Sequence, residues 1–242
     1  MLQKIDFESP DGIGTNTAYF ASGDGTNPVA LGTFIDGVNN GGIVRTNVDS
    51  PAFFATGVGN TVSGRTGSYL AIMYPQGYSA SFPGDGQGYL VLDKMYGSGA
   101  NFSVSFDFAA PNTTTSRYNS TNDYLRIEYS VDGGAWTPAL STIGSGSGKT
   151  GMVADLNGDS TYETTVGPAF TYLSRAITGV TCSNSFQIRL HFVSLAKDQY
   201  AVDNLTLNGD FAPVPEPSAY GLLGAGALAV VAVARRRRYA GK

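Results

Sequence analysis

The sequence predicts an all-β fold, in which an antiparallel β-sandwich is followed by one short C-terminal transmembrane helix. Three observations lead to this prediction. The 242 residues include 32 glycines and 14 tyrosines, a composition typical of short strands joined by tight turns. Several segments alternate apolar and polar side chains, as strands with one buried face do. An uncharged apolar run occupies residues 219–234 near the end of the chain. We therefore divide the chain into a sandwich (1–211), a proline-rich linker (212–218) and a helix with an arginine-rich tail (219–242).

The strands of the sandwich are expected where the alternation is cleanest. In residues 101–108, 124–131 and 186–193, apolar side chains fall on one face and mostly polar ones on the other, the pattern of an antiparallel sandwich. Residues 11–66 are rich in Gly, Asn and Thr, and we interpret them as loops and short strands. Asp132-Gly133-Gly134 predicts a tight hairpin leading to a short strand near Trp136. The predicted strands are 4–8, 68–74, 88–93, 101–108, 124–131, 170–177, 186–193 and 201–207.

Two of these segments also carry a resemblance. The run Tyr-Leu-Arg-Ile-Glu-Tyr-Ser-Val-Asp-Gly-Gly-Ala-Trp at 124–136, followed by Ala-Val-Asp-Asn-Leu-Thr-Leu at 201–207, resembles the paired inner strands of extracellular β-jelly-roll domains. Carbohydrate-binding modules and adhesin-like domains are among these. The resemblance implies a jelly-roll-like sandwich, and it fixes no activity.

The charge of the chain is unevenly distributed. Five of the 15 Lys and Arg residues lie in residues 235–242, so ten remain to face all 19 acidic residues, giving about −9 for residues 1–234. An acidic domain of this kind argues against nucleic acid as a partner and suits a secreted domain that binds divalent cations. Cys182 is the only cysteine, which excludes an intrachain disulfide.

The end of the chain combines three features in a fixed order. A box of two prolines around a glutamate precedes the apolar run, and four arginines follow it. Proline interrupts strands and helices, and arginines hold the end of a membrane helix on the cytoplasmic side. The box and the cluster consist of Val214, Pro215, Glu216, Pro217, Ser218, Arg235, Arg236, Arg237 and Arg238.

This tail resembles the PEP-CTERM sorting signal. The resemblance implies an exported protein that is recognised by an exosortase, a membrane-embedded cysteine protease, and cut near the box. Its destination would be the cell surface or an exopolysaccharide matrix. The alternative is an ordinary C-terminal membrane anchor. As a helix, the 16-residue run would rise about 24 Å against a hydrocarbon core of about 30 Å, which favours transient insertion with a cytoplasmic C-terminus.

The beginning of the chain does not match this interpretation. Residues 1–5 lack the apolar region of a signal peptide, and Ile5 and Phe7 already resemble the first strand. We therefore expect a true start upstream or a trimmed signal.

No catalytic constellation is visible in the sequence, which predicts a protein without enzymatic activity. His191 is the only histidine, and no G-x-S-x-G sequence is present. The expected ectodomain function is glycan binding or adhesion. A secreted polysaccharide-active enzyme and a ligand-free structural matrix protein remain as alternatives. The aromatic residues that we consider for stacking on sugar rings are Tyr74, Tyr78, Tyr89, Tyr96, Tyr118 and Trp136.

One loop predicts a structural Ca²⁺. Asp155, Asn157, Asp159 and Glu163 stand at positions 1, 3, 5 and 9 of an EF-type loop, with the carbonyl of Thr161 at position 7. The loop departs from the full pattern, because Ser160 replaces the glycine at position 6 and Val166 replaces the glutamate at position 12. The alternative is a solvated turn rich in Asp and Asn. A second candidate for the cation is Asp203, which shares a strand face with Leu205 and Leu207 and so needs a partner or a cation. The resemblance to calcium-bearing jelly rolls implies that Glu8 could join it.

Overall fold

The computed structural model describes eleven segments of the chain: residues 1–5, 18–22, 27–29, 42–46, 62–64, 69–73, 87–111, 123–145, 151–157, 159–193 and 199–213. Glu8, the sorting box, the predicted transmembrane helix and the arginine cluster lie outside these residues, as do Tyr74, Tyr78 and Tyr118. Within the described residues, no helix is long and apolar enough to cross a membrane.

The described residues form strands, and no helix occurs among them, so the all-β prediction is confirmed. Each pairing between two of these strands is antiparallel. The strands are β1 (Gln3–Ile5), β2 (Ala18–Ser22), β3 (Asn27–Val29), β4 (Gly42–Thr46), β5 (Tyr69–Met73), β6 (Gln87–Leu92), β7 (Met95–Ala109), β8 (Tyr124–Val131), β9 (Thr137–Gly144), β10 (Met152–Asp155), β11 (Thr164–Val166), β12 (Thr171–Ile177), β13 (Ser185–Val193) and β14 (Gln199–Pro213).

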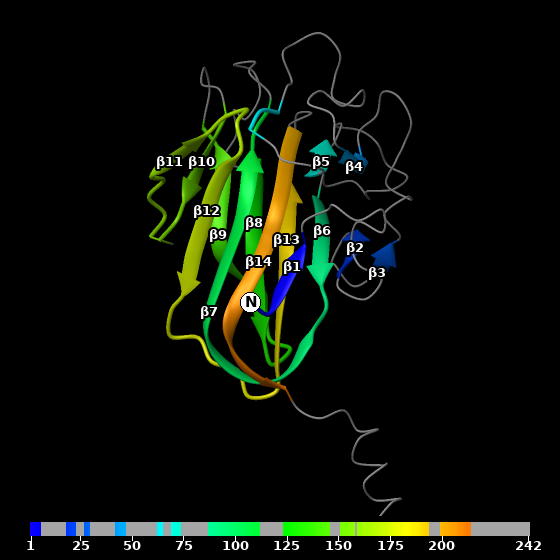
Figure 1. The fold of residues 1–242 in the computed structure, drawn as a ribbon, viewed down its shortest axis with the longest axis vertical. Helices are drawn as coiled ribbons and strands as arrows, with labels where there is room; N and C mark the ends of the chain where they lie inside the picture. Colours follow the sequence, from blue (N-terminus) through cyan, green and yellow to red (C-terminus); the bar gives the residue numbers. More distant parts are fainter. Residues whose placement is uncertain are drawn as a thin grey trace, which may run out of the picture.

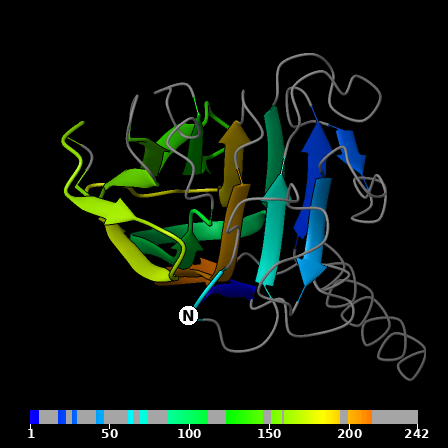
Figure 2. The ribbon, with the colours of Figure 1, turned by 90° about the horizontal axis from the view of Figure 1, so that it is seen from above.

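These strands form one sheet that curls into two layers (Figures 1 and 2). Sheet A has the order β12-β7-β14-β5-β4, with β1 also paired to β14. Sheet B has the order β11-β10-β9-β8-β13-β6-β2-β3. β7 joins the two layers, because Met95 and Tyr96 pair with β13 while the rest of the strand pairs with β14 and β12.

The hydrophobic core fills the space between the layers. The four alternating residues of β7, Phe102, Val104, Phe106 and Phe108, are at most 1% exposed, as the sequence pattern predicts. Phe102 stacks on Phe186 of β13 with ring centroids 3.8 Å apart, which ties the two sheets together. Each such buried side chain contributes about 1.5–3 kcal/mol. The alternation has a second consequence, since it sends the intervening residues of β6, β8 and β13 to the outer face of sheet B.

The hairpin predicted at Asp132-Gly133-Gly134 is present. Asp132 and Gly133 have φ values of 52° and 75°, and the Gly134 amide donates to the Val131 carbonyl at 2.8 Å. The Asp132 carboxylate also accepts hydrogen bonds from the amides of residues 183–185. These bonds, with that of Ser185 first, lower the pKa of Asp132 and fix the β8–β9 hairpin against the start of β13.

Several strands differ in position or length from the expectation. β9 runs over eight residues instead of forming a short strand at Trp136. The acidic loop lies between β10 and β11, strands of four and three residues that are too short to show periodicity in the sequence. β14 continues to Pro213, two residues beyond the expected end of the sandwich, by pairing with Gly97–Ala100 of β7.

Candidate functional site

The outer face of sheet B carries a row of aromatic and charged side chains. On β13, His191 lies between Arg126 of β8 and Tyr89 of β6, because it pairs with both. Two residues earlier, Arg189 lies in the same way between Glu128 and Val91. Strand alternation directs the next residues of each strand, such as Leu190, into the core instead.

These side chains form a continuous stack. The Arg189 guanidinium lies between two rings, 4.3 Å from the centroid of Trp136 and 4.2 Å from that of Tyr89. Tyr89 stacks on His191 at 4.3 Å, and His191 meets Tyr124 edge to face at 5.0 Å. The Arg126 guanidinium covers the far side of the row, 3.8 Å from the Tyr124 centroid. We call this set the outer-face stack: Trp136, Arg189, Tyr89, His191, Tyr124 and Arg126.

Glu128 holds the centre of the stack together. Arg189 Nε donates to its Oε2 at 2.7 Å, and His191 Nδ1 lies 3.0 Å from its Oε1. Burial alone would raise the pKa of Glu128, but the hydrogen bonds and charges of His191 and Arg189 outweigh burial and lower it. All three side chains are more than nine-tenths buried. The carboxylate is therefore ionised at neutral pH and fixes both neighbours.

The hydrogen bond to Glu128 also determines the proton on the histidine. A carboxylate only accepts hydrogen bonds, so His191 Nδ1 carries the proton and donates to it. In the neutral ring, Nε2 has no proton and accepts a hydrogen bond. The Tyr124 hydroxyl lies 3.3 Å from Nε2 and is placed to donate to it. Burial is the main cause that raises the pKa of Tyr124, which keeps its proton in place at neutral pH.

Arg126 differs from Arg189 in its surroundings. Among the residues that the structure describes, no carboxylate pairs with its guanidinium. Its Nε is buried and has no hydrogen-bond partner. The side chain as a whole is half-buried, as are Tyr124 and Trp136, so the stack is open at both ends and closed in the middle.

The sequence marks Tyr89 and Trp136 as candidates for sugar stacking and His191 as the only histidine, but it does not join them into one site. His191 does face outward, but it is only 6% exposed because its neighbours cover it. A signal was present in the alternation, since residues 126 and 128 on one strand and 189 and 191 on another are all charged or titratable.

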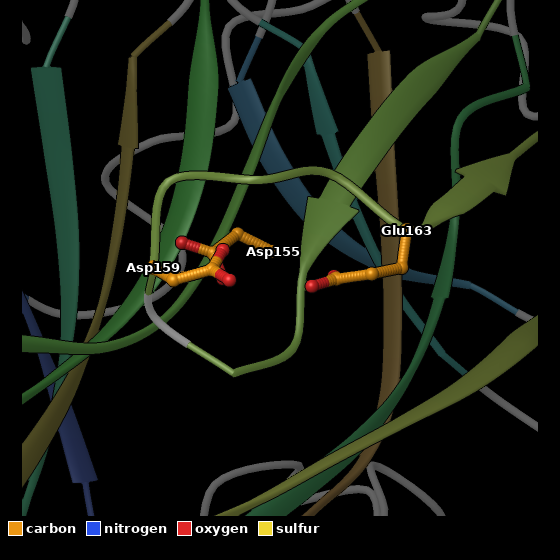
Figure 3. A group of neighbouring side chains, drawn as sticks. All are labelled: Asp155, Asp159 and Glu163. Atoms are coloured by element: carbon orange, nitrogen blue, oxygen red, sulfur yellow. The ribbon is translucent and has the colours of Figure 1, made fainter.

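The predicted calcium loop brings three of its carboxylates together. One oxygen from each of Asp155, Asp159 and Glu163 lies within 4.8 Å of the others. Figure 3 shows Asp155 and Asp159 beside each other, with Glu163 pointing toward them from the other arm of the loop. Asp155 is buried at the end of β10, whereas the other two are exposed. Within the described residues, this is the only such group of three His, Cys, Asp or Glu side chains.

The same loop is stabilised by its own hydrogen bonds. The amide of Asp159 donates to Asn157 Oδ1 at 2.9 Å, and that of Thr161 donates to Asp159 Oδ1 at 2.7 Å, forming two successive Asx-turns. The Ser160 amide donates to Asp155 Oδ2 at 3.1 Å, and Leu156 to Glu163 Oε2 at 3.0 Å. Ser160 takes the φ of 68° that glycine adopts in the full EF pattern. The oxygen-rich donor set fits a hard cation, although these amides already use part of it.

Asp203, the second metal candidate, is buried in β14 and its carboxylate accepts a hydrogen bond from the Asn204 amide at 2.7 Å. It lies where the register between β14 and β7 shifts, with Asn204 at a φ of 50°.

Of the tyrosines considered for sugar stacking, Tyr89 belongs to the outer-face stack. Tyr96 of β7 is 65% exposed and lies outside the stack.

Comparison with known proteins identifies the C-terminal segment of the chain. Residues 213–238 match the model of the PEP-CTERM protein-sorting motif, a range that includes the box at 214–218 and the arginines at 235–238. The chain is therefore an exported protein, and its described part is an all-β, jelly-roll-like domain. The motif marks a secreted, surface-targeted protein and implies processing by an exosortase, which confirms the resemblance seen in the sequence.

Solved structures resemble the domain at low identity. TmCBM61, solved in complex with β-1,4-galactotriose, matches with a TM-score of 0.40 and 10% identity over 85% of this chain and 95% of its own. The K3 adhesin domain of Lys-gingipain from Porphyromonas gingivalis matches at 0.44 and 14%, over 86% and 98%. A family 11 carbohydrate-binding module from Clostridium thermocellum matches at 0.34 and 11%, over 88% and 96%. No curated protein matches the chain in sequence. At these values the likeness says nothing of ligands, so function has to come from the residues of this chain.

Proposed function

We propose that this chain is a cell-surface or exopolysaccharide-matrix protein whose sandwich binds glycan, without catalysis, on the outer face of sheet B. The observation that carries the proposal is the outer-face stack, with its half-exposed aromatic rings at Trp136 and Tyr124. An aromatic face matches the apolar C–H face of a sugar ring, and adjacent charged groups reach the hydroxyls. The sorting motif supports the same function, because it sends this face outside the cell.

The rigidity of the stack supports binding as well. Arg189 is fixed by Glu128 and by two rings, so the centre of the face loses little side-chain freedom when a ligand arrives. A merely solvated sheet face does not need a buried ion pair beneath its aromatic residues. Removal of two charges from water is costly, and packed apolar residues would stabilise the sheet at least as well.

A polysaccharide-active enzyme is the second candidate, because Glu128, His191 and Tyr124 form a chain of groups through which a proton can pass. Two features favour binding over catalysis. Glycoside hydrolysis needs a pair of carboxyl groups, whereas none of the six stack residues is an acid and the hydrogen bonds of Arg189 and His191 lead to one carboxylate, that of Glu128. The lowered pKa of Glu128 and the raised pKa of Tyr124 keep the first from acting as an acid and the second from acting as a base near neutral pH.

A structural Ca²⁺ in the loop at 155–163 completes the proposal for the domain. The support is the convergence of Asp155, Asp159 and Glu163, with Asn157 and the Thr161 carbonyl as further oxygens in the predicted set. The ion would hold β10 and β11 together, which are short and pair with few residues. Asp203 with Glu8 stays the alternative position.

Before processing, the apolar run at 219–234 would hold the chain in the membrane, with the arginines on the cytoplasmic side. An exosortase and an extracellular polysaccharide are then the two partners in succession. Nucleic acid is not expected as a partner, because residues 1–234 carry about −9 charge.

The test is a glycan-binding screen of the purified full chain, run beside a reducing-sugar release assay. Binding that is lost in Trp136→Ala and Tyr124→Leu, and kept in Tyr172→Ala, would support the proposal. Tyr172 is the matched control, since it is 67% exposed on β12 of the other sheet. Sugar release that disappears in Glu128→Gln would favour the enzyme instead. If neither glycan binding nor sugar release is detected, the result would favour a structural matrix protein without a ligand.

A further inference from the structure

We propose that the outer face of sheet B selects a carboxylated polysaccharide, and that Arg126 binds the carboxylate of a uronic acid residue. This inference rests on the proposed glycan-binding function and names its ligand class. It starts from the two arginines of the stack, which have the same residue type and different surroundings.

The first step concerns charge. Glu128 neutralises Arg189 through the 2.7 Å hydrogen bond to its Oε2, and its Oε1 bonds to His191. Both carboxylate oxygens are therefore engaged by residues of β13. Arg126 keeps its charge uncompensated, because no described carboxylate reaches it. A cation that no described carboxylate pairs with is a local feature in an otherwise acidic domain. It attracts one anionic group at one position, while the rest of the surface repels polyanions.

The second step concerns geometry. The central carbon of the Arg126 guanidinium lies over the Tyr124 ring, 3.8 Å from its centroid, and this contact restricts the side chain. Tyr124 is itself held by His191, so the arrangement is rigid before any ligand binds. A planar guanidinium presents paired N–H groups that match the two oxygens of a carboxylate. A neutral hydroxyl offers only one oxygen and no charge, so it matches this edge less well.

The third step concerns an unsatisfied donor. Arg126 Nε is buried and has no hydrogen-bond partner, although most buried polar groups in folded proteins have one. Because this atom is covered, a ligand oxygen on the outer face would instead meet the terminal N–H groups of the same half-buried guanidinium. The Tyr124 ring beside it and Trp136 at the other end of the stack are the half-exposed rings on which neighbouring sugars of the same chain would stack.

The experiment measures binding of the full chain to polygalacturonate and to its methyl-esterified form, which share one backbone and differ in the carboxylate charge. We expect tighter binding to the acid form. Arg126→Gln should lower affinity for polygalacturonate about 10- to 100-fold and affinity for the ester by a much smaller factor, so that the preference for the acid form is lost. Trp136 fluorescence in urea shows that the variant is folded. Arg126→Lys should fall between, because it keeps the charge and loses the planar fork. Lys94→Gln is the control, as it removes one exposed positive charge near the end of β6.

Three results would overturn the inference. Equal binding of the acid and the ester by the wild type would mean that the protein does not recognise the carboxylate charge of the glycan. Undiminished binding of polygalacturonate by Arg126→Gln would remove Arg126 from the site. Equal affinity for dextran sulfate would indicate general attraction of polyanions. The proposed function survives each of these results, because a glycan is still bound; it fails separately if no glycan of the panel binds.

Discussion

Glu128 and Arg189 face each other on neighbouring strands of sheet B and share a 2.7 Å hydrogen bond. The Arg189 guanidinium that donates it lies between the rings of Trp136 and Tyr89. Their exposed fractions are 7% and 9%. An ion pair in this position has lost its water on both sides. Its net contribution to stability can be small, but the cost of removing one partner is large, since the other remains buried and charged.

Glu128→Ala should therefore destabilise the fold by about 3–5 kcal/mol. Trp136 is the only tryptophan and touches Arg189, so its fluorescence in urea reports unfolding at this site. The double change Glu128→Leu with Arg189→Met is the matched control and should cost less than Glu128→Ala alone. A single variant that loses under about 1 kcal/mol would contradict a buried and water-free pair.

The same carboxylate predicts a pH dependence. His191 and Arg189 outweigh burial and hold the folded pKa of Glu128 below its ordinary value of 4.5. A lowered acid pKa stabilises the folded state at pH values above the unfolded pKa. That stabilisation is lost as pH falls from about 4.5 through the folded pKa. Urea midpoints of the wild type should therefore fall more steeply below pH 4.5 than those of Glu128→Gln. Parallel pH profiles would show that Glu128 is not shifted.

The strands of the core were predictable from the sequence because their signal is local. Residues 124–131 and 186–193 alternate over eight residues, and they appear as β8 (Tyr124–Val131) and β13 (Ser185–Val193). One apolar face per strand, such as Leu125 and Ile127 on β8, is enough to predict that these strands pack in a sandwich. The glycine-rich sequence also marks the hairpin at Asp132.

The outer-face stack was not predictable in the same way, since it depends on register. Nothing in the sequence places residue 189 opposite residue 128 and residue 91, because the three belong to strands separated by long stretches of chain. The acidic loop is the reverse case. Its spacing is local, so the sequence predicted the meeting of Asp155, Asp159 and Glu163, while the bound ion stays a prediction.

Calcium should raise the melting temperature of the full chain, and EDTA should lower it, because an ion that binds only the folded state stabilises it. At a free concentration of 100 times the dissociation constant, the gain is about 2.7 kcal/mol. Asp155→Asn with Asp159→Asn should abolish the shift, whereas Asp210→Asn, outside the loop, should keep it. Identical melting curves in EDTA and in calcium would remove the site. A shift that survives the double variant would move the ion to Asp203 and Glu8.

The sorting motif predicts that the C-terminal tail is cut near the box. Replacement of Pro215, Glu216 and Pro217 by alanine should leave the chain unprocessed and held in the membrane of a host that has an exosortase, because the box is then gone while the apolar run and the arginines remain. Cell fractionation and mass spectrometry of the C-terminus measure this directly. Ser218→Ala is the matched control, since it changes a neighbouring residue and leaves Pro215, Glu216 and Pro217 in place, and it should be processed normally. A mature wild-type protein that still ends at Lys242 would contradict cleavage near the box and favour a permanent anchor.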